Sequence, residues 1–150
     1  MEGENLSREV VRPPNAFSRH PTSHRLEFGT EFAVDVKHRV VIVKFGKSLK
    51  REDIEHYVQQ LRANASFDPT FSEIVDLTRV EGVSLSGEDI LRLADHIDPF
   101  SSGSYRAFIT KDAAQTHLAR MYQISRMAGD KIRSFPSMEE AEKWIQSVGK

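Results

Sequence analysis

The feature that most constrains this chain is a repeated change in the spacing of its apolar residues. Between residues 26 and 36, apolar side chains occupy alternate positions, which is typical of a half-buried strand. The uninterrupted run within 39–45 predicts a second, more deeply buried strand. From Ile54 to Ala65 the apolar residues follow instead the spacing of one stripe on an amphipathic helix. This change of period favours a sheet covered by helices.

The remaining segments continue the alternation. Strands are predicted at 73–78, 105–110 and 131–135, and helices at 86–97, 112–128 and 137–148. The order is therefore β-β-α-β-α-β-α-β-α. This alternation predicts an α/β protein with a mostly parallel sheet, opened by one antiparallel hairpin.

Residues that begin and end helices support these boundaries. Ser86 with Asp89 predicts a partial capping box, and Ser137 with Glu140 predicts a full one. Gly129 is the predicted end of the helix that starts near residue 112.

Residues 1–25 lack this patterning. They are polar, contain three prolines and show no periodic apolar residues, so we expect a flexible N-terminal arm. The following residues, 26–150, are expected to form one domain, because a chain of 150 residues can bury a substantial core without disulfides.

Composition excludes several classes of protein. A formal net charge of -1 lacks the basic footprint of a nucleic-acid-binding surface. The absence of cysteine excludes disulfides and thiolate metal sites. The longest wholly apolar run, Val40–Val43, is far shorter than a membrane-spanning helix. We therefore expect a cytoplasmic protein with no nucleic-acid partner and no membrane insertion.

No motif for catalysis or metal binding meets its spacing rule. Gly82, Ser84 and Gly87 superficially resemble a nucleophile elbow, but the second glycine follows the serine by three residues instead of two. His96 lies near Asp95 and Asp98, but no second histidine stands four residues from it, so a solvated surface is the simpler interpretation. We expect no catalytic residue, no metal site and no cofactor.

Three stretches carry a resemblance to a known family. The order of elements, the stretch Ile74–Val80, the helix start Ser86-Gly87 and the closing segment 137–145 together resemble the SpoIIAA-like group of the STAS superfamily. The founding members of that superfamily are anti-sigma-factor antagonists. The resemblance covers roughly residues 26–148 and implies a five-stranded mixed sheet with helices chiefly on one face.

The resemblance also implies a functional locus in the loop after the third strand. In the antagonists, the first serine of an Asp-Ser-Ser-Gly stretch is phosphorylated by a partner kinase. The matching stretch here is Ser84-Leu85-Ser86-Gly87, so the modifiable position is Leu85, which has no hydroxyl. Ser86 already serves as a helix cap, and the acidic residues that follow it would repel a phosphate. We therefore expect no phosphoserine switch.

Two functions remain open, with a hydrolase ranked below both. The leading hypothesis is a non-catalytic binding or regulatory module that recognises a protein partner, or a second copy of itself in a homodimer. Its candidate binding residues are Arg79, Glu81, Ser84, Ser86 and Gly87. The alternative is a carrier or sensor of a small apolar or lipid-like ligand, held between the sheet and the helix at 112–128. The aromatic residues that could line such a pocket, or simply fill the core, are Phe67, Phe71, Phe100, Tyr122 and Trp144.

Overall fold

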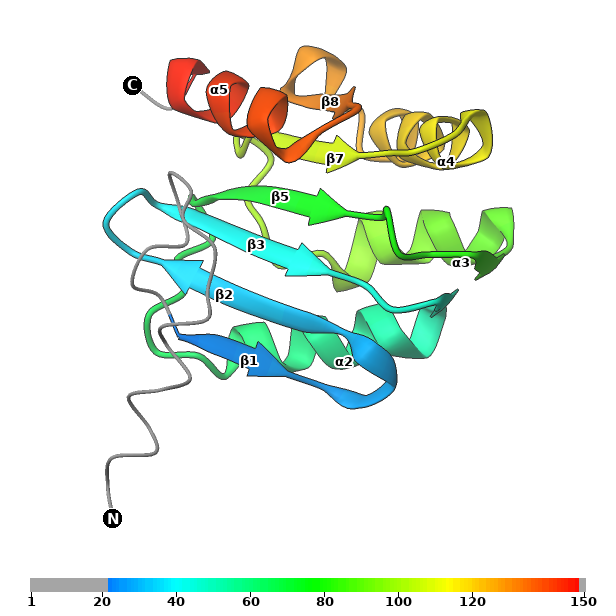
Figure 1. Cartoon of the computed structure of the whole chain (residues 1–150), viewed down its shortest axis with the longest axis horizontal. Coiled ribbons are helices and arrows are strands. Elements are labelled where there is room, and N and C mark those ends of the chain that lie inside the picture. The colour runs from blue at the N-terminus through cyan, green and yellow to red at the C-terminus, as the bar shows by residue number, and fades with distance from the viewer. Residues whose placement is uncertain (1–21, 149–150) are drawn as a thin grey trace.

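The computed structural model describes residues 22–148 and contains a main sheet of six strands (Figure 1). Along the sheet the strands are β1 (Ser23–Arg25), β2 (Glu31–Asp35), β3 (Val40–Lys44), β5 (Ser72–Asp76), β7 (Arg106–Ile109) and β8 (Ile132–Phe135). The pairs β1–β2 and β2–β3 are antiparallel, and β3, β5, β7 and β8 are parallel to one another. The predicted mixed sheet opened by an antiparallel hairpin is confirmed.

The sheet has six strands instead of the five expected, because β1 was not predicted. Its three residues are all polar, so no apolar alternation marks it in the sequence. It is held by antiparallel pairing with β2, in the register Ser23↔Ala33 to Arg25↔Glu31. The strand lies at the end of the segment 1–25 that we expected to be a flexible arm. Residues 1–21 of that segment lie outside the described residues.

The helices are α2 (Arg51–Arg62), α3 (Gly87–Arg92), α4 (Ala113–Ser125) and α5 (Met138–Val148). A turn of π-helix, η2 (Leu93–Ile97), continues α3, and short 3₁₀ turns, η1 (Glu27–Gly29) and η3 (Gly129–Lys131), precede β2 and β8. A second, two-stranded parallel sheet joins β4 (Ser48–Lys50) to β6 (Gly82–Ser84). This small sheet was not predicted, since three residues are too few to show a period.

The two faces of the main sheet bury different sets of residues. Val41, Val43 and Phe108 point to the face covered by α2 and α4, together with Tyr57 from α2 and Ala119 from α4. The intervening strand positions point to the opposite face, where α5 packs. This second set comprises Val40, Ile42, Ile74, Ala107 and Ile109 from the strands, with Ala141 and Ile145 from α5. Helices therefore lie chiefly on one face, as expected, with α5 alone on the other.

Helix starts agree with the sequence, and one helix end does not. The Asp89 backbone N–H donates to Ser86 Oγ at 3.0 Å, and the Ser86 backbone N–H donates to Asp89 Oδ2 at 3.0 Å, so the capping box is complete. Helix α4 ends at Ser125, before the predicted Gly129. Met127 takes the left-handed conformation, with φ of 54°, and Gly129 begins the 3₁₀ turn instead. Arg126, which follows Ser125, donates to the carbonyl oxygens of Ala94 and Phe100.

Candidate functional site

A cavity of about 80 Å³ lies between the main sheet and the layer formed by α2, α3, η2 and α4. Each element contributes apolar side chains to its wall. They include Val75 and Phe108 from the strands, and Val58, Leu93 and Leu118 from α2, η2 and α4. Interiors of proteins are normally packed with few voids larger than a water molecule. A void of this size in the main core is therefore a feature to be explained.

The cavity approaches the surface where its wall is incompletely buried. Ile54 of α2, Leu85 after β6 and Ile97 of η2 all line it and are only half-buried. Arg62, at the end of α2, donates from Nη2 to the Ile97 carbonyl oxygen at 2.8 Å. This contact ties α2 to η2 beside the half-buried wall. Because the half-buried residues lie on α2 and around the segment α3–η2, a molecule reaching the cavity would pass between these two elements.

One end of the cavity is formed by buried charged groups on neighbouring strands. Glu73 of β5 and Arg106 of β7 face each other in register, and Arg106 Nε donates to Glu73 Oε1 at 2.9 Å. Their side chains are only 4% and 5% exposed. The hydroxyl of Tyr57, from α2, donates to Glu73 Oε2 at 2.6 Å. Strand pairing thus brings the two charges together, and α2 adds the phenol above them.

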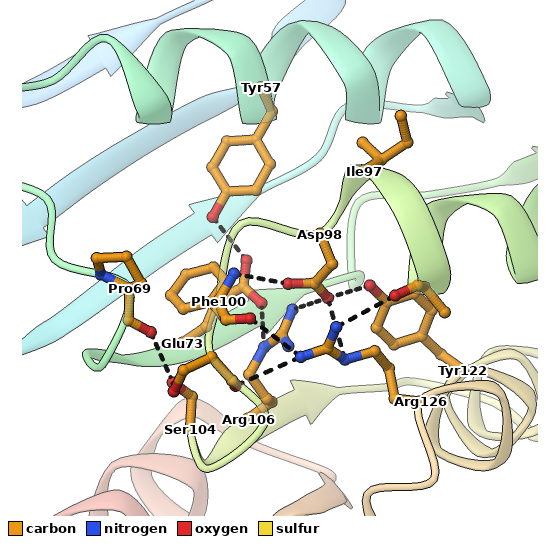
Figure 2. A network of polar contacts seen from close by, with 12 residues as sticks. Tyr57, Pro69, Glu73, Ile97, Asp98, Phe100, Ser104, Arg106, Tyr122 and Arg126 are labelled. Atoms are coloured by element: carbon orange, nitrogen blue, oxygen red, sulfur yellow. Dashed lines mark hydrogen bonds and ion pairs between the residues drawn. The ribbon is translucent and has the colours of Figure 1, made fainter.

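Asp98, at the end of η2, completes this cluster (Figure 2). Its side chain is 1% exposed, and it accepts hydrogen bonds from Arg106 Nη2 at 2.8 Å and from the Tyr122 hydroxyl. The backbone N–H of Phe100 donates to its other oxygen at 2.9 Å. A carboxylate buried to this extent needs several donors to offset its lost hydration. Asp98 obtains them from β7, α4 and the chain that follows η2.

Arg126, just after α4, lies beside the same carboxylate. Its Nε lies 3.7 Å from Asp98 Oδ2. Its terminal nitrogens donate to the carbonyl oxygens of Ala94 at 3.1 Å and of Phe100 at 3.1 Å. These bonds hold the start of the α4–η3 connection against η2. They also occupy the guanidinium donors that could otherwise point into the cavity.

The protonation states in the cluster follow from burial and from these contacts. Burial raises the pKa of Glu73, while Arg106 opposes that rise. Burial also raises the pKa of both Tyr57 and Tyr122, and Glu73 and Asp98 add to the effect, so both hydroxyls remain protonated donors. Burial alone would lower the pKa of Arg106, but the two carboxylates raise it further than burial lowers it. Arg106 is therefore a permanent cation.

The residues selected from the sequence lie elsewhere. Arg79, Glu81, Ser84, Ser86 and Gly87 are all exposed on the stretch between β5 and α3. Arg79 Nη1 forms an ion pair with Glu31 Oε2 at 3.0 Å, and Ser86 caps α3 as predicted. None of the five lines the cavity. Among residues 79–87, only Leu85 lines the cavity, and it occupies the position of the phosphorylatable serine in the resemblance.

The charged residues of the cluster were missed by the sequence reasoning. Asp98 was interpreted with His96 as part of a solvated surface, whereas its side chain is buried. The available signal was a pair of opposite charges, Glu73 and Arg106, each at the start of a predicted buried strand. Charges in such strands are rarely left unpaired, so the two strands could have been inferred to be neighbours.

Of the five aromatic residues weighed as pocket lining, the structure places one in the cavity wall. Tyr122 lines the cavity. Phe67 packs edge-on against both Phe71 and Phe100, which agrees with ordinary core packing. Trp144 contacts Tyr105 on the opposite side of the sheet.

Two wider features of the described residues bear on the class of protein. Within 22–148, no cluster of three or more histidine, aspartate or glutamate side chains has the arrangement of a metal site. None of the helices in that range combines the length and the apolar character required to cross a bilayer.

Comparison with known proteins shows the fold. The structure is similar to the crystal structure of an uncharacterized protein of the DUF3478 family from Shewanella loihica PV-4, described as having a SpoIIAA-like fold. The two share 19% sequence identity with a TM-score of 0.51, over 84% of this chain and 92% of that one. This protein has a SpoIIAA-like fold. No family model matches the sequence, and the search of curated proteins finds no match.

Proposed function

We propose that this protein is a non-catalytic binding protein that holds a small apolar molecule between its main sheet and the helices α2 to α4. The observation that carries the proposal is the cavity of about 80 Å³, whose wall is apolar except for the buried polar cluster at one end. An engineered apolar cavity of about 150 Å³ stays dry and takes up benzene. The smaller cavity here has room for a short alkyl group, and the half-buried wall leaves a route for a longer molecule to protrude.

The hydrogen bonds of the buried carboxylates support ligand binding over catalysis. Glu73 and Asp98 each accept hydrogen bonds from an arginine and a tyrosine of the protein. A general base or a nucleophile needs a lone pair directed at the reacting atom. Carboxylates engaged in this way are better suited to fixing the shape of one end of a cavity.

An NMR titration tests this function. Butan-1-ol, added to the protein, should shift the resonances of residues around the cavity with saturation. Replacement of Leu118 by Phe fills the cavity from α4 and should abolish the saturable shifts. Replacement of Ile124 by Phe, on the exposed side of the same helix, is the matched control and should leave them unchanged. Equal binding by both variants, or no binding by the native protein, would refute the proposal.

A second candidate, a partner-binding surface at Arg79–Gly87, is favoured by a separate observation. Strand β6 is exposed at all three residues, and among the described strands it pairs with β4 alone. An unpaired edge of this kind can accept an extended segment of another chain, including a second copy of this one. Exposed Val83 at its centre would supply an apolar contact.

Sedimentation equilibrium tests the version with a second copy. The native protein should form a concentration-dependent dimer, and Val83→Lys should shift it to monomer by placing a charge at the edge. Val36→Lys, at an exposed valine beyond β2, is the control and should leave the dimer intact. A monomer at all concentrations, or equal dissociation by both variants, would exclude self-association through β6.

A further inference from the structure

The polar end of the cavity presents hydrogen-bond acceptors, and this restricts the ligand. Tyr57, Glu73, Asp98, Arg106 and Tyr122 all contribute to the cavity wall. They converge from α2, β5, the end of η2, β7 and α4 (Figure 2). What these groups offer a ligand depends on which of their donors and lone pairs are already used.

Each of the two tyrosine hydroxyls already donates its proton in a hydrogen bond to a carboxylate. A phenol has one O–H donor and two acceptor lone pairs. The Tyr57 hydroxyl donates to Glu73 at 2.6 Å, and the Tyr122 hydroxyl donates to Asp98. Each hydroxyl oxygen therefore has only acceptor capacity left. The raised pKa of both phenols keeps them protonated, so this polarity does not reverse at neutral pH.

The two arginines bind the protein through Nε and Nη2 of Arg106 and through the terminal nitrogens of Arg126. Arg106 donates to both buried carboxylates and lies over the ring of Phe100 at 4.5 Å. Arg126 lies beside Asp98 and donates to backbone carbonyl groups. Both guanidinium groups thus offset the negative charge of the carboxylates. Arg126 also binds carbonyl groups of the π-turn and of the chain after it. A ligand carboxylate has no proton to donate at pH 7, so it cannot bond to the acceptor oxygens of the two tyrosines.

From this arrangement we infer that the ligand is a short-chain apolar molecule whose head donates a hydrogen bond, a primary alcohol or amine, and that carboxylates bind more weakly. The apolar chain occupies the part of the cavity near Leu93 and Leu118, and the head lies against the oxygens of Tyr57 and Tyr122. This inference rests on the proposed ligand-binding function. It adds the chemical class of the ligand.

Two isomers provide the cleanest test. Butan-1-ol and methyl propyl ether have the same atoms and nearly the same size, but only the alcohol can donate a hydrogen bond. One net hydrogen bond is worth about 1 kcal/mol, so the alcohol should bind about fivefold more tightly. Butylamine should bind at least as well as the ether, and butyrate should bind more weakly than either. Dissociation constants come from the NMR titration at pH 7.

Variants that lack the tyrosine hydroxyls test where the polar head of the ligand binds. In the protein with Tyr57→Phe and Tyr122→Phe together, the advantage of the alcohol over the ether should disappear while the ether still binds. Tyr105→Phe, on the other face of the sheet, is the matched control and should preserve the advantage. Circular dichroism confirms that each variant is folded. If the double variant does not fold, the comparison of isomers on the native protein decides the question alone.

The outcomes separate the two proposals. If none of the four compounds binds, the proposed function itself fails. If they bind but the ether or butyrate equals or exceeds the alcohol, the cavity is a binding site and the inference about its ligand is overturned. An advantage for the alcohol that survives loss of both tyrosine hydroxyls would also overturn it.

Discussion

The two faces of the main sheet are built from alternate residues of the same strands, yet they are packed in opposite ways. Under α5, Ile74 and Ala107 are fully buried in an apolar layer. Across the sheet their chain neighbours, Glu73 and Arg106, are equally buried but charged, and a cavity lies beside them. Apolar packing alone suffices to hold a helix on this sheet. The charges and the void on the other face are therefore not requirements of the fold, which is why we assign the binding site to that face.

The largest expected effect is on the charged face. Arg106→Met leaves Glu73 and Asp98 buried without their main cationic partner, so the free energy of unfolding should fall by about 3–5 kcal/mol. Urea denaturation followed by circular dichroism measures the loss. Adding Glu73→Gln to the same chain should recover part of it, because one buried charge is removed. A loss below about 1 kcal/mol would mean that the cluster is more hydrated than its burial indicates.

On the face under α5, the free energy of unfolding should depend on the volume of the buried side chains and not on ionisation. Ile74→Ala removes a fully buried side chain, so the free energy of unfolding should fall by about 3 kcal/mol. The loss should be the same at pH 5 and pH 8, because no described ionisable group of the cluster lies on this face. The urea midpoint at both pH values gives the answer. A pH-dependent loss would show that the two faces are coupled through the sheet.

An identical enlargement on each face tests the difference in packing directly. Val40→Ile adds one methylene to the close-packed face and should destabilise the protein by about 1 kcal/mol. Val75→Ile adds the same group at the cavity wall, where it should have no cost or stabilise the protein by up to about 0.8 kcal/mol. Thermal denaturation of the pair provides the comparison. Equal destabilisation by both would indicate that the cavity wall does not accept additional volume.

The smallest effect concerns the titration of Glu73. Its pKa is raised in the folded protein by burial, so the folded state binds a proton more tightly than the unfolded state does. The contribution of Glu73 to stability is therefore fully present below its unfolded pKa and is lost as pH rises through the folded value. Relative to Glu73→Gln, the native protein should lose stability as pH increases above about 4.3, the usual value for glutamate. Urea denaturation of both proteins across pH 4–8 measures this difference, and the opposite slope would contradict the direction of the shift.

Elements whose apolar residues follow a regular period were predicted from the sequence. The stripe from Ile54 corresponds to α2, and the caps at Ser86 and Ser137 start α3 and α5. In contrast, β1 is polar and is defined by its pairing with β2. Pairing partners far along the chain leave no periodic trace, so such a strand is not visible in the local sequence.

The site was harder to predict for the same reason. Asp98 is bound by Arg106 and by Tyr122, which lie 8 and 24 residues further along the chain. The sequence places Asp98 beside other polar residues, and this local context indicates a surface. Only the packing of the end of η2 beside Arg106 of β7 and Tyr122 of α4 brings it inside. The cavity itself is a property of how the helices meet and has no counterpart in any single segment.

Asp98 has one further consequence, for the rate at which this part of the molecule opens. Its backbone N–H closes the π-turn by donating to the Leu93 carbonyl oxygen at 2.8 Å, while its carboxylate is fixed by β7 and α4. Lifting η2 from the sheet must break the bonds of the Asp98 carboxylate to β7 and α4, whereas the bond inside the π-turn can stay formed. The rate at which η2 lifts, and with it the admission of a ligand, should therefore be set by the loss of the bonds that the Asp98 carboxylate accepts.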